Sequence, residues 1–191
     1  MDVSDSKNKP TLGFLTVVEH PHYGLFGGYL ILNTAGRPLE FHCTAPIKPN
    51  RAQQILYGPT LESFIYVEQI GQTLIGHGSA PPLLVCTDRE PALAAREHVS
   101  SPVVLVLPPE TPSEPVDEEP TRLFRIDPPH HGGPRLAVFQ LGRNRLALPE
   151  RADEDRRLIA DRLADLAESF DLAEPFQRIR DAIEEAQQAV R

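Results

Sequence analysis

The stretch TLESFIYVEQIGQTLI, residues 60–75, decides how this chain folds. Its apolar residues recur at the spacing of a helix and cover more than one narrow stripe of that helix. Thr60 can cap the helix through its side-chain oxygen, and Gly76 and Gly78 can end it. We therefore expect a helix over 60–75 that is the most buried helix of the protein, with the other elements packed around it.

Three strands are expected before this helix, over 11–18, 25–33 and 39–47, where β-branched, aromatic and other apolar residues dominate. Turn-forming residues between the second and third strands predict that these two strands form an antiparallel hairpin. Gly27 and Gly28 lie inside the second strand, where they predict a bulge or a close approach of another part of the chain.

Two short strands and a short helix are expected after the central helix. Residues 83–86 and 103–107 are continuous apolar runs, which are typical of strands covered on both faces. Between them, residues 90–97 predict a short helix with Pro91 in its first turn. The order β-β-β-α-β-α-β over 1–107 predicts a mixed sheet, and hence an α/β (α+β) core domain.

A proline-rich and acidic stretch over 108–120 predicts an extended linker after this core. Residues 121–191 are expected to form a second, smaller unit, a β-meander followed by a helical hairpin over 151–191. The strands of the meander are expected over 122–126, 135–141 and 145–148. Each of the two C-terminal helices carries an apolar seam that needs a partner, which is either the meander or another chain.

The composition limits the classes of function. The net charge is −8, with 19 Lys and Arg residues against 27 Asp and Glu residues. General binding of nucleic acid is therefore disfavoured, because phosphate binding needs concentrated positive charge. No apolar run approaches the roughly 18 residues of a membrane-spanning helix, and the first residues do not resemble a secretory leader. We expect a cytoplasmic protein without a membrane partner.

The two cysteines, Cys43 and Cys86, lie in apolar strand-like runs, and both are expected to be reduced and to belong to the core. Side chains alternate along a strand, so His42 and Cys43 should point to opposite faces. This alternation disfavours a nucleophilic Cys43 with His42 as its base.

Polar residues gather near the expected strand ends. Glu19, His42 and Asp88 are the candidate catalytic residues, because carboxylates and imidazoles perform acid–base chemistry when neighbouring strands bring them together. His20 and His22 are the candidate metal ligands. The alternative is that the histidines are solvated and that Asp88 caps the helix that follows it.

A second group of polar residues precedes the central helix. Lys48, Asn50 and Arg51 lie where a short helical stretch begins, and they are the candidate residues for binding a small anion such as a phosphate or a carboxylate. The alternative is a solvated loop.

The order of elements over 11–107 resembles that of the ribonuclease H-like superfamily. In that family, acidic residues on the first strand, on the first helix and at the end of the fourth strand hold two metal ions. The nearest acidic residues here are Glu19, Glu62 or Glu68, and Asp88. Glu19 lies at the end of its strand rather than within it, and the resemblance therefore implies a degenerate active site.

Three functions remain open. The first is a non-catalytic protein-interaction or regulatory module that binds a protein partner, or a second copy of itself, through 151–191. The second is a metal-dependent hydrolase or nuclease-like enzyme on the degenerate scaffold, and the third is a binder of small anions. No cofactor is predicted, although a divalent metal is possible for the second function.

Overall fold

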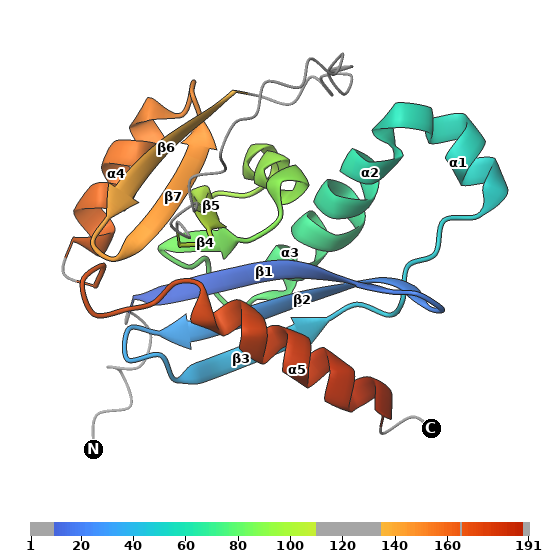
Figure 1. Cartoon of the computed structure of the whole chain (residues 1–191), viewed down its shortest axis with the longest axis horizontal. Helices are drawn as coiled ribbons and strands as arrows, with labels where there is room; N and C mark the ends of the chain where they lie inside the picture. Colours follow the sequence, from blue (N-terminus) through green and yellow to red (C-terminus); the bar gives the residue numbers. More distant parts are fainter. Residues whose placement is uncertain (1–9, 110–134, 165, 189–191) are drawn as a thin grey trace, which may run out of the picture.

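Seven strands form one mixed sheet in the computed structural model, which describes residues 10–109, 135–164 and 166–188 (Figure 1). The strands are β1 (Thr11–His20), β2 (Gly24–Asn33), β3 (Pro38–Cys43), β4 (Leu84–Thr87), β5 (Val103–Leu107), β6 (Leu136–Leu141) and β7 (Asn144–Pro149). Their order across the sheet is β3-β2-β1-β4-β5-β7-β6. β4 and β5 run parallel to β1, whereas every other pairing is antiparallel. The expected mixed α/β class is confirmed.

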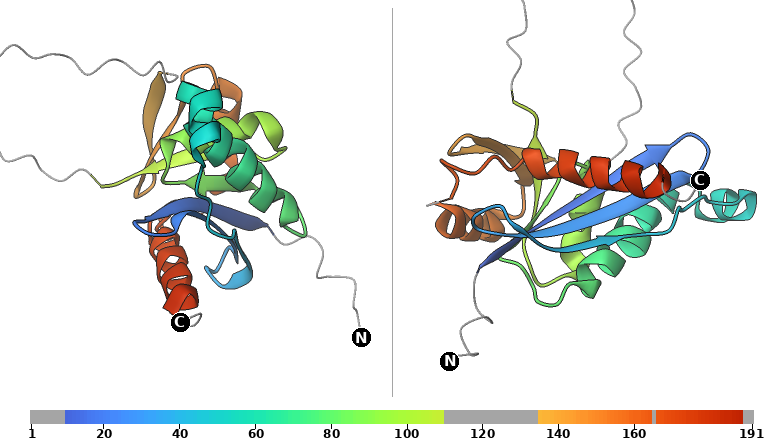
Figure 2. Two further views of the ribbon diagram at one scale, coloured as in Figure 1. Left: turned by 90° about the vertical axis from the view of Figure 1, so that its right-hand side faces the viewer. Right: turned by 90° about the horizontal axis from the view of Figure 1, so that it is seen from below.

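Helices cover both faces of this sheet (Figure 2). The helical elements are α1 (Arg51–Tyr57), η1 (Gly58–Thr60), α2 (Leu61–Ser63), η2 (Phe64–Gln72), α3 (Thr73–His77), η3 (Glu90–His98), α4 (Asp153–Leu163) and α5 (Glu174–Gln188). α2, η2 and α3 follow one another without a break, and we call them together the long helix. The long helix and η3 pack on one face of the sheet, and α4 and α5 pack on the other. No described helix is long and apolar enough to cross a bilayer.

The long helix lies where the sequence places it, but it begins differently. The Thr60 hydroxyl donates to the Tyr57 carbonyl at 2.8 Å and does not cap the helix. The expectation of a Thr60 cap is wrong because Pro59 sits in a turn of 3₁₀ helix that joins α1 directly to α2. The side chains of Ile65 and Ile70 are buried, whereas the side of the helix that carries Glu62 and Glu68 is exposed.

Gly27 and Gly28 let helices approach β2 from both faces. A Cβ atom on Gly27 would lie 2.3 Å from Cγ2 of Ile70 on the long helix. A Cβ atom on Gly28 would lie 2.3 Å from Cγ2 of Ile179 on α5. Both distances are shorter than carbon atoms tolerate, so close approach explains the glycine pair. The irregularity in the β2–β3 pairing lies elsewhere, between Ile31 and Leu32.

The C-terminal part differs from the expected meander with a helical hairpin. β7 pairs with β5, so β6 and β7 extend the sheet of the N-terminal part. α5 crosses β1 and β2, while α4 lies beside β6 and β7 (Figure 1). The apolar seams of the two helices, which include Ile159, Leu163, Phe176, Ile179 and Ile183, join the core on this face. They therefore have their partner within the chain. The expected linker from residue 110 onward and the expected strand over 122–126 lie outside the described residues.

The two cysteines lie in different surroundings. Cys86 on β4 is fully buried, as expected, but Cys43 is exposed. The expectation for Cys43 is wrong because β3 is an edge strand, and its outward residues Leu39, Phe41 and Cys43 are incompletely covered.

Candidate functional site

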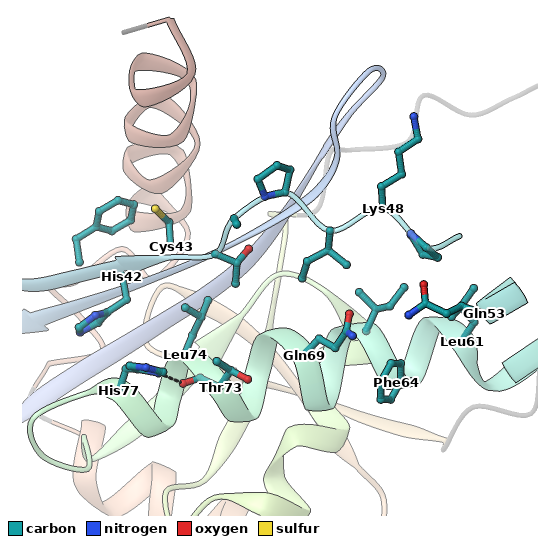
Figure 3. Close-up of a pocket in the computed structure, with 17 residues that line it drawn as sticks. His42, Cys43, Lys48, Gln53, Leu61, Phe64, Gln69, Thr73, Leu74 and His77 are labelled. Carbon is teal, nitrogen blue, oxygen red and sulfur yellow. Dashed lines mark hydrogen bonds between the residues drawn. The ribbon is translucent and has the colours of Figure 1, made fainter. Parts of the chain in front are cut away.

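A groove of about 840 Å³ runs between residues 41–49 and the long helix (Figure 3). We call it the β3 groove, because one of its walls is β3 and the extended chain that continues β3. The other wall is the flank of the long helix, with Leu61 and Phe64 at one end and His77 at the other. No aspartate or glutamate is among the described residues that line it. The volume lies in the range of ligand-binding clefts.

Glu40 and His42 form a hydrogen-bonded unit at the His77 end of the groove. His42 Nε2 lies 3.1 Å from Glu40 Oε2, and the backbone N–H of Ser79 donates to the same oxygen at 3.1 Å. The hydrogen bond from His42, aided by Ser79, holds the pKa of Glu40 below its usual value. A carboxylate only accepts hydrogen bonds, so His42 carries a proton on Nε2. In the neutral ring, Nδ1 therefore keeps its lone pair.

His77 is held in a similar way. Its Nδ1 lies 2.6 Å from the carbonyl oxygen of Thr73, which can only accept, so Nδ1 carries a proton. The centres of the His42 and His77 rings are 6.4 Å apart. Figure 3 shows His42 pointing toward the long helix and Cys43 pointing away from it, which fits the expected alternation of these two side chains. The two imidazoles therefore form the polar end of the groove.

Tyr29 lies behind His42, with the two rings stacked at 6.5 Å. Its hydroxyl is buried and has no hydrogen-bond partner among the described groups, and burial raises the pKa of Tyr29 well above its usual value. Gly13 on β1 makes room for the ring, since a Cβ atom there would lie 2.5 Å from the Tyr29 hydroxyl oxygen.

The candidate anion-binding residues do not converge. Asn50 and Gln53 form a reciprocal capping box at the start of α1, which uses the Asn50 side chain. Lys48 borders the groove, but its ammonium group lies 3.5 Å from the His22 carbonyl oxygen and extends away from the groove floor (Figure 3). Arg51 is exposed in the first turn of α1.

Asp88, the candidate at the end of β4, is bound by two other elements. The hydroxyl of Thr16 on β1 donates to Oδ1 at 2.6 Å, and the guanidinium of Arg180 on α5 donates to Oδ2. Arg89 adds a longer contact, with Nε 3.9 Å from Oδ1. Asp88 does not cap η3, because the N-cap position belongs to Arg89 and has no side-chain hydrogen bond.

The remaining candidates lie at or just after the end of β1. His20 lines a second cavity of about 430 Å³ between the β1–β2 turn and α5. Its Nδ1 accepts the backbone N–H groups of His22 at 3.1 Å and Tyr23 at 3.3 Å, so that lone pair is already used. Glu19 lies one position before His20, and side chains alternate along β1, so it points to the opposite face. There its charge, like those of Glu62 and Asp88, acts on Tyr66 of the long helix, whose pKa is raised mainly by burial.

The candidate residues predicted from the sequence do not lie together in one site. Some of them instead contact residues that the sequence analysis did not single out. His42 lies in the β3 groove, His20 lies beside α5, and Asp88 is bound to Thr16 and Arg180. Within the described ranges, no three His, Cys, Asp or Glu side chains are placed to hold one metal ion.

The sequence analysis did not identify four residues that contact the candidate residues, namely Thr16, Glu40, His77 and Arg180. The alternation along β3 puts Glu40 and His42 on one face, so their pairing was open to prediction. Arg180 lies 92 residues from Asp88, and no local pattern links the two.

In comparison with known proteins, no family model matches the chain, and no curated protein matches it.

Proposed function

We propose that this chain is a non-catalytic α/β module in the ribonuclease H-like strand order, and that it binds a protein partner through the β3 groove. The order β3-β2-β1-β4-β5, with β4 and β5 parallel to β1, supports the architectural part of this proposal. The observation that carries the functional part is the state of Asp88, whose two carboxylate oxygens are bound by Thr16 and Arg180.

Asp88 lies where the ribonuclease H-like resemblance calls for a metal ligand, at the end of the fourth strand. In place of an acidic residue, β1 presents the Thr16 hydroxyl to it. The Arg180 guanidinium supplies the positive charge that a divalent cation would otherwise bring, and it donates a charge-assisted hydrogen bond. This arrangement favours a structural role for Asp88.

The β3 groove supports the binding role. Its walls combine apolar side chains such as Leu61 and Phe64 with a few polar groups, as ligand-binding clefts do. At the Leu61 end, α1 exposes Ile55 and Leu56, whose exposed fractions are 65% and 82%. Exposed large apolar side chains beside a groove are typical of protein-interaction surfaces. Because the seams of α4 and α5 are buried in the core, the groove replaces 151–191 as the proposed association surface.

A partner-binding experiment tests this proposal. A photo-reactive amino acid at position 56 of the full chain should crosslink one discrete cellular protein, which is then purified. The purified protein should bind the full chain, and the double variant Ile55→Asp/Leu56→Asp should weaken its affinity by at least about tenfold, since about 1.4 kcal/mol of apolar contact is lost. The control is Val138→Asp, which places one aspartate on an exposed apolar residue of the opposite edge strand, β6, and is compared with each single variant, Ile55→Asp and Leu56→Asp, as well as with the double variant. Equal loss of affinity in the control would contradict the proposal.

The alternative function is a metal-dependent hydrolase. A phosphodiesterase assay distinguishes the two functions. We expect no Mn²⁺-dependent hydrolysis of bis(p-nitrophenyl) phosphate by the full chain. Hydrolysis that is present in the parent protein and lost in Asp88→Asn would overturn the proposal that the chain is non-catalytic.

A further inference from the structure

Two imidazoles at the polar end of the β3 groove each keep one ring nitrogen free. His42 donates from Nε2 to the Glu40 carboxylate, and His77 donates from Nδ1 to the Thr73 carbonyl. In the neutral rings, the lone pairs therefore lie on Nδ1 of His42 and on Nε2 of His77. The two nitrogens of an imidazole point to opposite sides of the ring, so each lone pair points away from the group that holds its ring.

Both rings are held in the way that metal-binding histidines are held. A histidine that binds a metal almost always donates its other N–H group to a carboxylate or a backbone carbonyl, which fixes the tautomer and the orientation of the ring. Glu40 does this for His42, and the Thr73 carbonyl does it for His77. Glu40 is in turn fixed by the backbone N–H of Ser79. The supporting hydrogen bonds of a metal site are thus already in place.

The spacing of the rings suits one shared ion. The ring centres of His42 and His77 are 6.4 Å apart. Because a Zn–N bond is about 2.0–2.1 Å long, two imidazoles on one zinc ion have ring centres about 5–6.5 Å apart, with the lower value at the tetrahedral angle. The observed separation lies at the upper end of this range. His77 is exposed, so its side chain is free to move by the roughly 1 Å that tetrahedral geometry requires.

The charges around this end of the groove favour a cation. Lys48 is the one Lys or Arg among the described residues that line the groove, and its ammonium group contacts the His22 carbonyl instead. The Glu40 carboxylate lies directly behind His42 and raises the basicity of the ring. Imidazole nitrogens suit zinc and its neighbours among the transition metals, whereas Mg²⁺ and Ca²⁺ prefer oxygen ligands.

From these features, we propose that Nδ1 of His42 and Nε2 of His77 bind one zinc ion across the polar end of the β3 groove. Water fills the remaining positions on the ion. The ion joins the edge strand β3 to the long helix, so its binding stabilises the fold at this end of the groove. The zinc site goes beyond the proposed function and does not depend on it, because partner binding rests on the Leu61 end of the groove.

Titration calorimetry of the full chain with Zn²⁺ tests the site. His42→Gln and His77→Gln should each lower the affinity at least about tenfold. The double variant should bind little more weakly than either single variant, because the two nitrogens act on the same ion. His20→Gln is the matched control and should bind as the parent does, since Nδ1 of His20 already accepts the N–H groups of His22 and Tyr23. A parent affinity weaker than about 1 mM, or an equal loss in His20→Gln, would overturn the proposal.

NMR of the ring nitrogens locates the ion without any substitution. Zn²⁺ should shift the signals of Nδ1 of His42 and Nε2 of His77 together, with the same dependence on concentration, and should leave those of His20 unchanged. Mg²⁺ should shift none of them. A response from only one of the two rings means that they do not share an ion, which contradicts the site.

Glu40 is assigned as the positioning residue of the zinc site. Glu40→Gln should lower the affinity for Zn²⁺ about tenfold, and the ring-nitrogen spectrum should show that His42 no longer keeps its proton on Nε2 alone. Glu68→Gln, on the exposed side of the long helix, is the control and should change neither. Zn²⁺ should also raise the Tm of the parent and of Glu68→Gln, but not that of His77→Gln. An unchanged affinity in Glu40→Gln would contradict the role assigned to Glu40.

Discussion

Arg180 on α5 donates a hydrogen bond to the carboxylate of Asp88 at the end of β4. The pair joins the last described helix to a central strand, and Thr16 of β1 completes the unit from the neighbouring strand. An aspartate at this end of β4 would otherwise attract a cation from solvent. Here the chain provides the cation itself.

Removing the Arg180 charge should lower stability modestly. Because the side chains of Arg180 and Asp88 are 34% and 16% exposed, we expect Arg180→Gln to reduce the free energy of unfolding by about 1 kcal/mol. Urea denaturation measures the change. Arg157→Gln on the exposed side of α4 is the control, with an expected change within about 0.5 kcal/mol. Similar losses in the two variants would show that the Asp88 contact contributes nothing specific.

Adding a methyl group at Gly27 or Gly28 should destabilise the fold more strongly. The new Cβ atoms would overlap Ile70 and Ile179, so Gly27→Ala and Gly28→Ala should each cost about 1–3 kcal/mol. Thermal unfolding is the measurement. Gly76→Ala is the control, because nothing lies within 4 Å of a Cβ atom there and alanine favours the helix. Gly28→Ala should lower stability less in a chain that already carries Ile179→Ala, because the smaller side chain leaves room for the new Cβ atom. If the losses of stability of the two single variants simply add in the double variant, the overlap is contradicted.

The two thiols should react at very different rates. Cys43 is exposed, whereas burial raises the pKa of the Cys86 thiol far above its usual value. A disulfide reagent such as Ellman's should therefore modify one thiol per folded chain and two after denaturation, with mass spectrometry assigning the first to Cys43. Rapid modification of both thiols in the folded chain would mean that β4 is not covered as described.

The Glu40–His42 pair should make stability depend on pH at the acidic end. The pKa of Glu40 is lowered in the folded state, so the unfolded chain binds its proton first as the pH falls. The stabilisation is complete above the ordinary glutamate value of about 4.3 and is lost as the pH falls through the lower, folded value.

Carboxyl NMR titration tests this expectation. His42→Phe keeps a ring against Tyr29 but removes the hydrogen-bond donor, so the pKa of Glu40 should rise toward its ordinary value. His98→Phe, at an exposed position, should leave it unchanged. A Glu40 titration that is the same in the parent and in His42→Phe would contradict the assigned hydrogen bond.

Much of the architecture could be predicted from local pattern. The apolar runs of β1, β4 and β5 identify strands directly, and the apolar spacing between Leu61 and Leu74 predicts a helix there, although not that Phe64–Gln72 is a π-helix. The position of β7 could not be predicted in this way. Its alternation is that of any half-buried strand, and the choice of β5 as its partner depends on which sheet edge is open in three dimensions.

The same limit applies to the candidate site. Pairs that are close in sequence, such as Glu40 with His42, follow from strand alternation. The pairing of Asp88 with Arg180 depends on how α5 crosses the sheet, and its apolar seam fixes only which side of α5 is buried. Glu19 and His20 do not converge on one site, because neighbouring positions of β1 face opposite layers.

At the paired glycines of β2, the long helix and α5 both lie close to the main chain of the sheet. Only the main chain of Gly27 and Gly28 separates Ile70 on one face of the sheet from Ile179 on the other, because glycine has no side chain. Ile70 belongs to the long helix, and other residues of that helix, such as Gln69 and Thr73, line the β3 groove. We therefore expect a variant that releases Arg180 from Asp88 to alter how the long helix packs on the sheet, and with it the groove on the far face.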